Sequence, residues 1–141
     1  MSVSVDTQIY TKYQTSDLAK SYGKAHWGLC TDQNQKHPHI VFNSIIDVPK
    51  FTFDQHELLF NQFQISVFGS PVQSRTEIAK IAEKIWRLYD NTKLLVTPEN
   101  TLEDTNYTIL SIIRRDSRIL LDSDNKSWYA VITFDIISEK S

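Results

Sequence analysis

Glycine and cysteine are both scarce in this 141-residue chain, and each shortage excludes a class of functional site. The only glycines are Gly23, Gly28 and Gly69, and their positions cannot form the G-x-G-x-x-G loop of dinucleotide-binding proteins or the G-x-S-x-G elbow of serine hydrolases. The single cysteine, Cys30, excludes an intrachain disulfide and every C-x-x-C zinc or redox motif. No apolar run approaches the ~20 residues of a membrane-spanning helix, so we expect no membrane partner.

The charge balance is not that of a dedicated nucleic-acid binder. Fifteen lysines and arginines stand against 17 aspartates and glutamates, a formal net charge of −2, whereas nucleic-acid binders usually carry a basic surplus. Hydrophobic residues make up 40% of the chain and aromatic residues 11%, which is enough for a packed core. The length predicts one domain over residues 1–141. No signal-peptide pattern is visible in residues 1–6, so we expect synthesis in the cytoplasm.

Residues 57–68 have the most regular alternation in the chain. The odd positions are Leu59, Asn61, Phe63, Ile65 and Val67. The even positions from Gln62 onward are mostly polar, so one face packs and the other is at least partly in contact with water. This pattern predicts a long antiparallel strand.

Residues 74–91 show the clearest helical pattern. Ser74 and Glu77 form the S-x-x-E capping box, in which each side chain satisfies a backbone donor at the start of a helix. An apolar stripe follows at helical spacing, consisting of Ile78, Ile81, Ala82, Ile85, Leu88 and Tyr89. The residues between them are expected to face water, namely Lys80, Glu83, Lys84, Arg87 and Asp90. The sequence therefore predicts one long amphipathic helix.

The other segments complete an α+β order. We expect a helix or two short helical turns over residues 7–22, with Ser16 as a possible cap and Gly23 at the end. Strands are predicted over residues 25–30, 40–46, 107–113 and 128–136, and residues 122–127 form a turn before the last of these. Residues 107–113 are apolar on both faces, as in a central strand. The fold class is therefore α+β, with a largely antiparallel β-sheet packed against one long amphipathic helix and a short N-terminal helical segment.

Three segments begin like functional motifs and fail at a required position. His56-Glu57 opens like a zinc-protease helix, but Phe60 takes the place of the second histidine. Residues 23–28 have the glycine spacing of a P-loop, yet the lysine and hydroxyl that must follow are missing. Residues 122–127 resemble the start of a calcium loop, but Lys126 is a cation at a ligand position. We interpret the last two as ordinary turns.

Four residues near one another in sequence, Cys30, His26, His37 and His39, are the candidates for a metal site or a Cys/His pair. No further ligand or orienting partner is evident, so the favoured interpretation is a buried small cysteine beside a surface loop. No catalytic pair of residues stands at a recognisable spacing elsewhere. We therefore expect no enzyme activity, no cofactor and no metal.

Five residues are candidates for an interaction surface. Arg114, Arg115 and Arg118 form the one dense basic cluster, either a solvated strand end balanced by nearby aspartates or a contact for an acidic partner or phosphate backbone. Phe60 and Phe68 lie on the otherwise polar face of the long strand. They mark either a subunit interface or a face covered by the helix or a loop.

Taken in order, these features resemble the small phage tail-terminator, tail-completion and head–tail joining proteins. The similar parts are the N-terminal helical segment, the strand led by Pro38, the Phe63-to-Ser70 strand, the helix containing Glu77 and Tyr89, and the strand that follows Ser127. The resemblance covers nearly the whole chain through structural patterns, without a chemical signature that would transfer interface residues.

The resemblance implies a structural subunit. It would form a homo-oligomeric ring, possibly hexameric, that caps the tail tube and docks it to head connector proteins. Such a protein would be made in the host bacterial cytoplasm and then reside at the head-proximal end of the tail. DNA would pass through the ring without sequence-specific recognition, and a slightly acidic chain suits that role because phosphate contacts would retard the DNA. The alternatives are another phage or bacterial binding module, such as a connector, baseplate or host-interaction protein, and a small enzyme or metal-binding domain that uses Cys30 or the two histidines His37 and His39.

Overall fold

The computed structural model describes residues 3–28, 38–51, 57–89, 107–124 and 126–140. Its elements in chain order are α1 (Val3–Gln14), α2 (Asp17–Tyr22), β1 (Ala25–Trp27), β2 (His39–Phe51), β3 (Glu57–Phe68), α3 (Arg75–Leu88), β4 (Tyr107–Asp122) and β5 (Ser127–Lys140). This order confirms the α+β class, the N-terminal helical segment and the long amphipathic helix.

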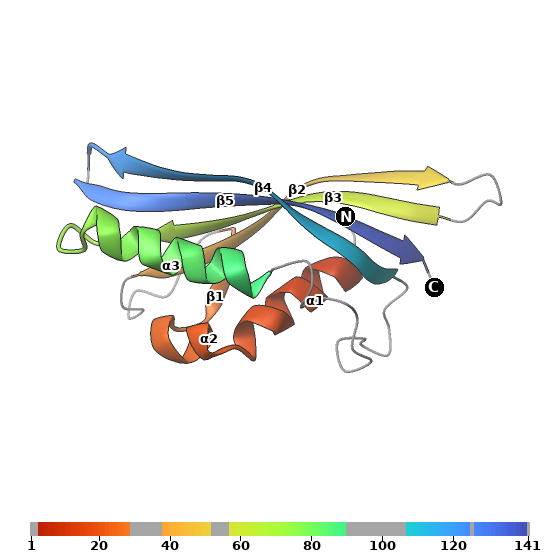
Figure 1. The fold of residues 1–141 in the computed structure, drawn as a ribbon, viewed down its shortest axis with the longest axis horizontal. Coiled ribbons are helices and arrows are strands. Elements are labelled where there is room, and N and C mark those ends of the chain that lie inside the picture. The colour runs from red at the N-terminus through yellow and green to blue at the C-terminus, as the bar shows by residue number, and fades with distance from the viewer. Residues whose placement is uncertain (1–2, 29–37, 52–56, 90–106, 125, 141) are drawn as a thin grey trace.

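The five strands form one sheet in the order β1-β2-β3-β5-β4. Neighbouring strands are antiparallel except β1, which runs parallel to β2 through the pairs Ala25↔Ile40 to Trp27↔Phe42. Bulges lie between Ser44 and Ile46 of β2, and between Arg114 and Asp116 of β4. Bulges bend a strand and increase its twist. Figure 1 shows the resulting twisted sheet, with β4 crossing over its neighbours near the middle.

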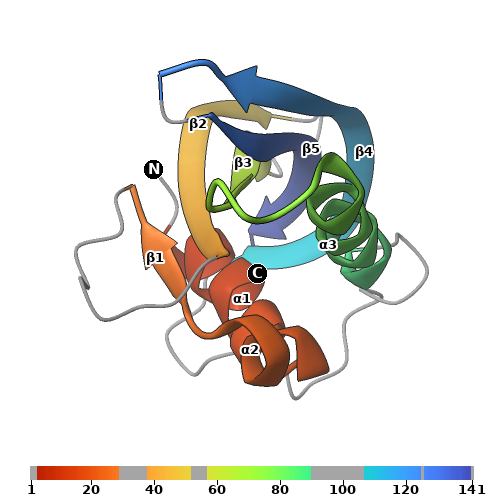
Figure 2. The ribbon, with the colours of Figure 1, turned by 90° about the vertical axis from the view of Figure 1, so that its left-hand side faces the viewer.

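The three helices lie on one side of the sheet (Figure 1). Viewed nearly along the strands, α3 lies beside β5 and β4, while α1 and α2 lie below the sheet between β1 and α3 (Figure 2). Helix α1 contacts both β1 and β4. The predicted capping residue of α3 is confirmed, because the Ser74 side chain accepts a hydrogen bond from the Glu77 N–H at 3.2 Å. Ser16 and Gly23 likewise begin and end α2, although no side-chain bond from Ser16 caps that helix.

The core lies between the sheet and the helices. It contains the predicted face of β3, with Phe63, Ile65 and Val67 fully buried, and the alternate positions of β5. Four residues of the predicted helix stripe are also buried, namely Ile78, Ile81, Ala82 and Ile85. An aromatic cluster fills the part beneath β1 and β2, where the ring of Phe42 meets those of Tyr13 and Phe63 at centroid distances of 5.6 Å.

Four of the predicted strands differ from the structure in extent or position. The strand predicted over residues 25–30 ends at Trp27, and the one predicted over residues 128–136 extends over Ser127–Lys140. The strand predicted over residues 40–46 extends over His39–Phe51 as β2. The strand predicted over residues 107–113 continues to Asp122 as β4 and lies at the edge of the sheet, not at its centre. Its second apolar face is not buried in this chain, since Ile113 is 48% exposed. In this strand, apolar residues on the second face therefore form a surface that the described parts of the chain do not cover.

Candidate interaction surface on the sheet

The side of the sheet opposite the helices is covered by no described helix, and we call it the open face. Strand alternation directs one set of side chains into the core and the other set to this face. The open face is formed by Ile45 of β2, Phe60, Gln62, Gln64 and Phe68 of β3, Ile113, Arg115, Asp116, Arg118 and Leu120 of β4, and Tyr129, Val131, Thr133, Asp135 and Ile137 of β5. It therefore mixes apolar, amide and charged groups.

Phe60 and Phe68 both belong to the open face and not to the helix-covered side. Phe68 is 40% exposed and stacks on Tyr129 of the neighbouring strand, with ring centroids 5.8 Å apart. Phe60 is half-buried and lines a shallow depression together with Ile113 and Ile137. Eight residues of extended strand separate the two phenylalanines, which places them about 27 Å apart. They are thus two separate apolar points on one face.

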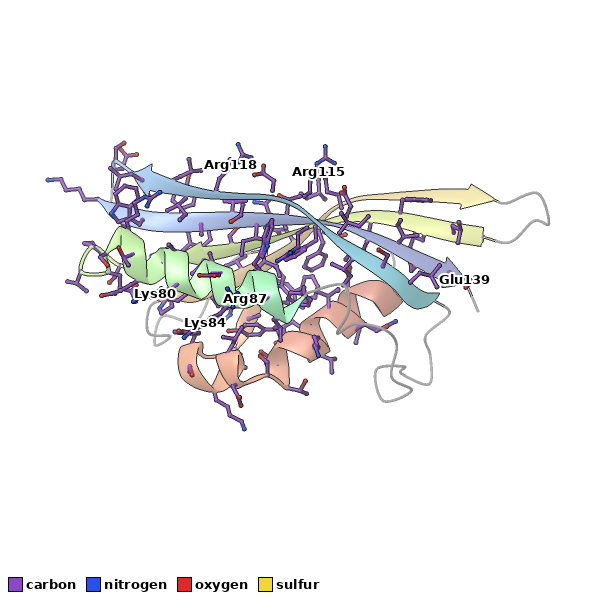
Figure 3. All side chains as sticks on the ribbon, in the orientation of Figure 1. Lys80, Lys84, Arg87, Arg115, Arg118 and Glu139 are labelled. Carbon is purple, nitrogen blue, oxygen red and sulfur yellow. The ribbon has the colours of Figure 1, made fainter. Side chains whose placement is uncertain are left out.

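The three arginines do not act as one cluster. They lie in the middle of β4 and not at a strand end, so the interpretation as a solvated strand end is wrong in position. The bulge between Arg114 and Asp116 shifts the alternation, so that the Arg114 side chain lies on the helix side, where its guanidinium carbon is 4.9 Å from the centre of the Trp86 ring. Arg115 and Arg118 project from the open face, away from α3 (Figure 3).

The two arginines of the open face are each paired with a carboxylate of the same face. Arg115 Nη1 lies 3.5 Å from Asp135 Oδ1, and Arg118 Nε lies 3.3 Å from Asp116 Oδ2. All four side chains are at least 40% exposed, and such pairs contribute little to stability because water screens them. The predicted balance of arginines by nearby aspartates is confirmed for Asp116, and Asp135 adds a partner that was not foreseen.

Two depressions lie in the open face on either side of Arg115. One, of about 350 Å³, is lined by apolar residues such as Phe60, Ile113 and Ile137 together with the Arg115–Asp135 pair. The other, of about 560 Å³, is lined by polar residues such as Gln64 and Thr133 together with Ile45 and Leu120. Both are shallow and open. Sites for small molecules are usually enclosed, so this surface suits contact with another macromolecule better.

The outward side of α3 carries a stripe of cations. Lys80, Lys84 and Arg87 lie along it (Figure 3), as the helical pattern predicts. Arg87 pairs with Glu83 at 2.7 Å, and Lys84 Nζ donates a hydrogen bond to the Tyr22 hydroxyl at 3.1 Å. The Lys84 contact joins the stripe to α2, and a shallow, open depression of about 290 Å³ lies among Lys80, Glu83, Lys84 and Arg87.

The candidate metal residues are only partly described. The rings of His26 and His39 lie 6.5 Å apart, brought together by the pairing of β1 with β2. Cys30, His37 and His56 lie outside the described residues. Within the described ranges, no group of three or more His, Cys, Asp or Glu side chains is arranged to hold a metal ion. At residues 122–127, the Asp122 side chain accepts a bond from the Asp124 N–H at 3.1 Å, the geometry of an ordinary turn.

Two buried tyrosines hold the helices together beneath this surface. The Tyr89 hydroxyl donates to the Ile9 carbonyl at 2.7 Å, and the Tyr13 hydroxyl donates to the Gly23 carbonyl at 2.9 Å. Burial raises the pKa of both phenols above the ordinary value of 10.0, and neighbouring tyrosines raise it further. Both hydroxyls are therefore structural donors. None of the helices in the described regions is both long and apolar enough to cross a membrane.

Comparisons with known proteins find a likeness in fold and none in sequence. No protein-family profile matches the chain, and no curated protein matches it in sequence. Among solved structures, the chain is similar to one chain of the structure described as "Virion of native gene transfer agent (GTA) particle", with a TM-score of 0.74 and 11% identity. The likeness covers 98% of this chain and 95% of that chain. At this identity it shows that the two chains share their whole fold.

Proposed function

We propose that this chain is a structural subunit of a phage-like particle, and that it acts as a tail terminator or head–tail joining protein. Copies of the chain form a ring, which caps the tail tube and offers a docking surface to the head connector. The observation that carries the proposal is the likeness to a chain of a gene transfer agent virion, which extends over 98% of this chain. That likeness agrees with the family resemblance of the sequence, which rests on the same order of elements.

The surface of the chain supports a role in assembly. The open face is shallow, and Phe68 and Ile113 on it are 40% and 48% exposed. The depression lined by Phe60, Ile113 and Ile137 gathers apolar side chains in one place, and such patches are common at protein contacts. A ring uses one surface of each copy against a different surface of the next, and such heterologous contacts close when the rotation between copies divides a full turn. The chain has no turnover in this role.

The first test is the native mass, measured by light scattering on a size-exclusion column over a concentration series. We expect a closed oligomer of fixed stoichiometry that remains the same size as the concentration increases. An open series of growing species would contradict a closed ring, because a heterologous contact that does not close produces filaments.

The second test addresses the terminator role itself. The tail-tube protein of the same particle is polymerised with and without the chain, and tube lengths are measured by electron microscopy. A terminator added at the start is expected to stop elongation and to appear at one end of each tube. Unchanged lengths with bare tube ends would refute the role. Capture of baseplate components or a host factor from an infected lysate, in place of tube protein, would favour another binding module.

A further inference from the structure

The turn that joins β3 to α3, residues 69–74, presents an apolar side chain to solvent. Val72 in this turn is 90% exposed, the highest value among the large hydrophobic residues that the structure describes, and the next highest is 53% at Leu121. Turn positions are usually occupied by Gly, Asn, Asp or Ser. A single exposed apolar residue is common on protein surfaces, and it is the structure around Val72 that makes this one distinctive.

Hydrogen bonds fix the backbone on which Val72 stands. The Gln73 N–H donates to the Ser70 carbonyl at 3.0 Å and closes a β-turn, with Pro71 and Val72 at its tip. The Ser70 N–H donates to the Gln73 side-chain oxygen at 2.8 Å, and the Gly69 N–H donates to a carbonyl of β5 at 3.0 Å. Because the turn is ordered in the single copy, a contact through Val72 requires little further loss of backbone entropy.

The open face holds a depression of matching character. It has a volume of about 350 Å³, and its apolar part is formed by Phe60, Ile113 and Ile137. Ile113 in this depression is 48% exposed. The charged groups at the depression, Arg115 and Asp135, are paired with each other, so an apolar side chain can lie against them without separating the two charges.

Within one copy the turn cannot reach this depression. Phe60 and Phe68 lie eight residues apart on β3, about 27 Å in an extended strand, and the turn comes after the Phe68 end. The turn leads into α3, on the side of the sheet opposite the open face, and lies at one end of the molecule (Figure 1). A contact between turn and depression therefore joins two copies through different surfaces, as a heterologous contact does.

Polarity distinguishes this turn from its neighbour at the same end of the sheet. Residues 69–74 contain no charged residue, whereas residues 122–127, between β4 and β5, contain Asp122, Asp124 and Lys126. Insertion of the charged turn into an apolar depression would remove those charges from water at a large cost. Of these two turns, only the one that carries Val72 suits the depression.

We propose that Val72 of one copy inserts into the open-face depression of a second copy of this chain, between Ile113 and Ile137. The inserted valine is the apolar anchor of the contact between subunits, and a few such buried side chains commonly dominate the affinity of an interface. The biological setting of this contact rests on the proposed ring. The contact itself is testable without any phage component.

A disulfide between the two surfaces is the first test. In a chain with Cys30→Ser, or Cys30→Ala where the serine variant does not fold, Val72→Cys is made in one preparation and Ile113→Cys in another. Their mixture, mildly oxidised, is expected to give a covalent dimer of twice the 16.4 kDa chain mass, and each preparation alone is expected to remain monomeric on a non-reducing gel. Leu121→Cys mixed with Val72→Cys is the matched control, because Leu121 is 53% exposed on the same strand as Ile113 and lies outside the depression.

The second test measures assembly by light scattering over a concentration series. Val72→Lys and Ile113→Lys are each expected to need at least a tenfold higher concentration to assemble than the unmodified chain, equivalent to about 1.4 kcal/mol. Leu121→Lys is expected to assemble like the unmodified chain. Circular dichroism and thermal unfolding check each variant. Threonine at the same position, with an effect in the same direction, serves where a lysine variant does not fold.

Three outcomes would overturn the contact: no more disulfide with Ile113→Cys than with Leu121→Cys, unchanged assembly of both lysine variants, or an unmodified chain that is monomeric at every concentration. None of them decides the proposed function, which the tube-end assay tests separately. A chain that caps tubes but forms no disulfide between these surfaces refutes the Val72 contact alone. A chain that forms the disulfide but never binds tube ends refutes the terminator role alone.

Discussion

Tyr89 is the residue through which the last turn of α3 is fixed to α1, and its replacement by phenylalanine gives a quantitative test of the packing. The hydroxyl is buried and donates to the Ile9 carbonyl at 2.7 Å, 80 residues away in sequence. Phenylalanine keeps the ring, which contacts Phe134 at a centroid distance of 5.4 Å, and removes only the donor. The change therefore isolates one hydrogen bond between two helices.

At neutral pH the expected loss is about 1 kcal/mol of unfolding free energy, the usual contribution of a neutral buried hydrogen bond. At alkaline pH the effect has a second part. Because the pKa of Tyr89 and of Tyr13 is raised in the folded chain, the unfolded chain loses these protons first as the pH rises above about 10. The contribution of the two phenols to the unfolding free energy is therefore complete below about pH 10. Above about pH 10 it decreases by about 1.4 kcal/mol per pH unit for each phenol.

The assay is urea unfolding at a fixed protein concentration, between pH 7 and pH 11, of the unmodified chain and Tyr89→Phe. The variant is expected to be less stable at pH 7 and to lose stability with a slope about 1.4 kcal/mol per pH unit shallower above pH 10. Tyr22→Phe is the control at pH 7, because its hydroxyl bonds Lys84 at the surface and its loss should cost less than about 0.5 kcal/mol. Equal stability at pH 7 together with an unchanged alkaline slope would refute the reasoning.

Three further substitutions test other parts of the packing by thermal or urea unfolding. Gly69→Ala should cost about 1–3 kcal/mol, because the added methyl would lie 2.7 Å from Ile78 Cδ1 and 3.0 Å from the Trp128 carbonyl oxygen; an unchanged midpoint would contradict the close approach. Ser74→Ala should cost about 1 kcal/mol through loss of the α3 cap, while Ser74→Asp should retain most of the stability. Phe63→Ala should cost about 3–5 kcal/mol, because the side chain is fully buried in the aromatic cluster; a loss below 1 kcal/mol would place the ring outside the core.

The parts of the fold that the sequence predicts correctly are those with a local period. Apolar residues alternate over the 12 residues of β3 and recur at helical spacing over the 14 residues of α3. Each pattern therefore identifies the buried face of its element, whichever element packs against it. The capping box at Ser74 is equally local. The position of β4 is different, because residues that are apolar on both faces look the same whether their own chain or another chain covers them.

The candidate surface was only partly predictable, because one extra residue in a strand reverses every later side chain. The bulge between Arg114 and Asp116 separates Arg114 from Arg115 and Arg118, although the three appear as one cluster in the sequence. The pair of His26 and His39 depends on the parallel pairing of β1 with β2, which is a property of the folded sheet. Neither the bulge in β4 nor the contact between His26 and His39 can be predicted from a local sequence pattern.

The proposed position of this chain is a ring at the head-proximal end of a phage-like tail. The most direct measurement is immunogold electron microscopy of particles from the strain that encodes the chain, with antibodies raised against the purified protein. We expect one cluster of label at the junction of head and tail in each particle, and at one end only of detached tails. Label at the distal tip or along the whole tube, or no label on purified particles, would contradict this position.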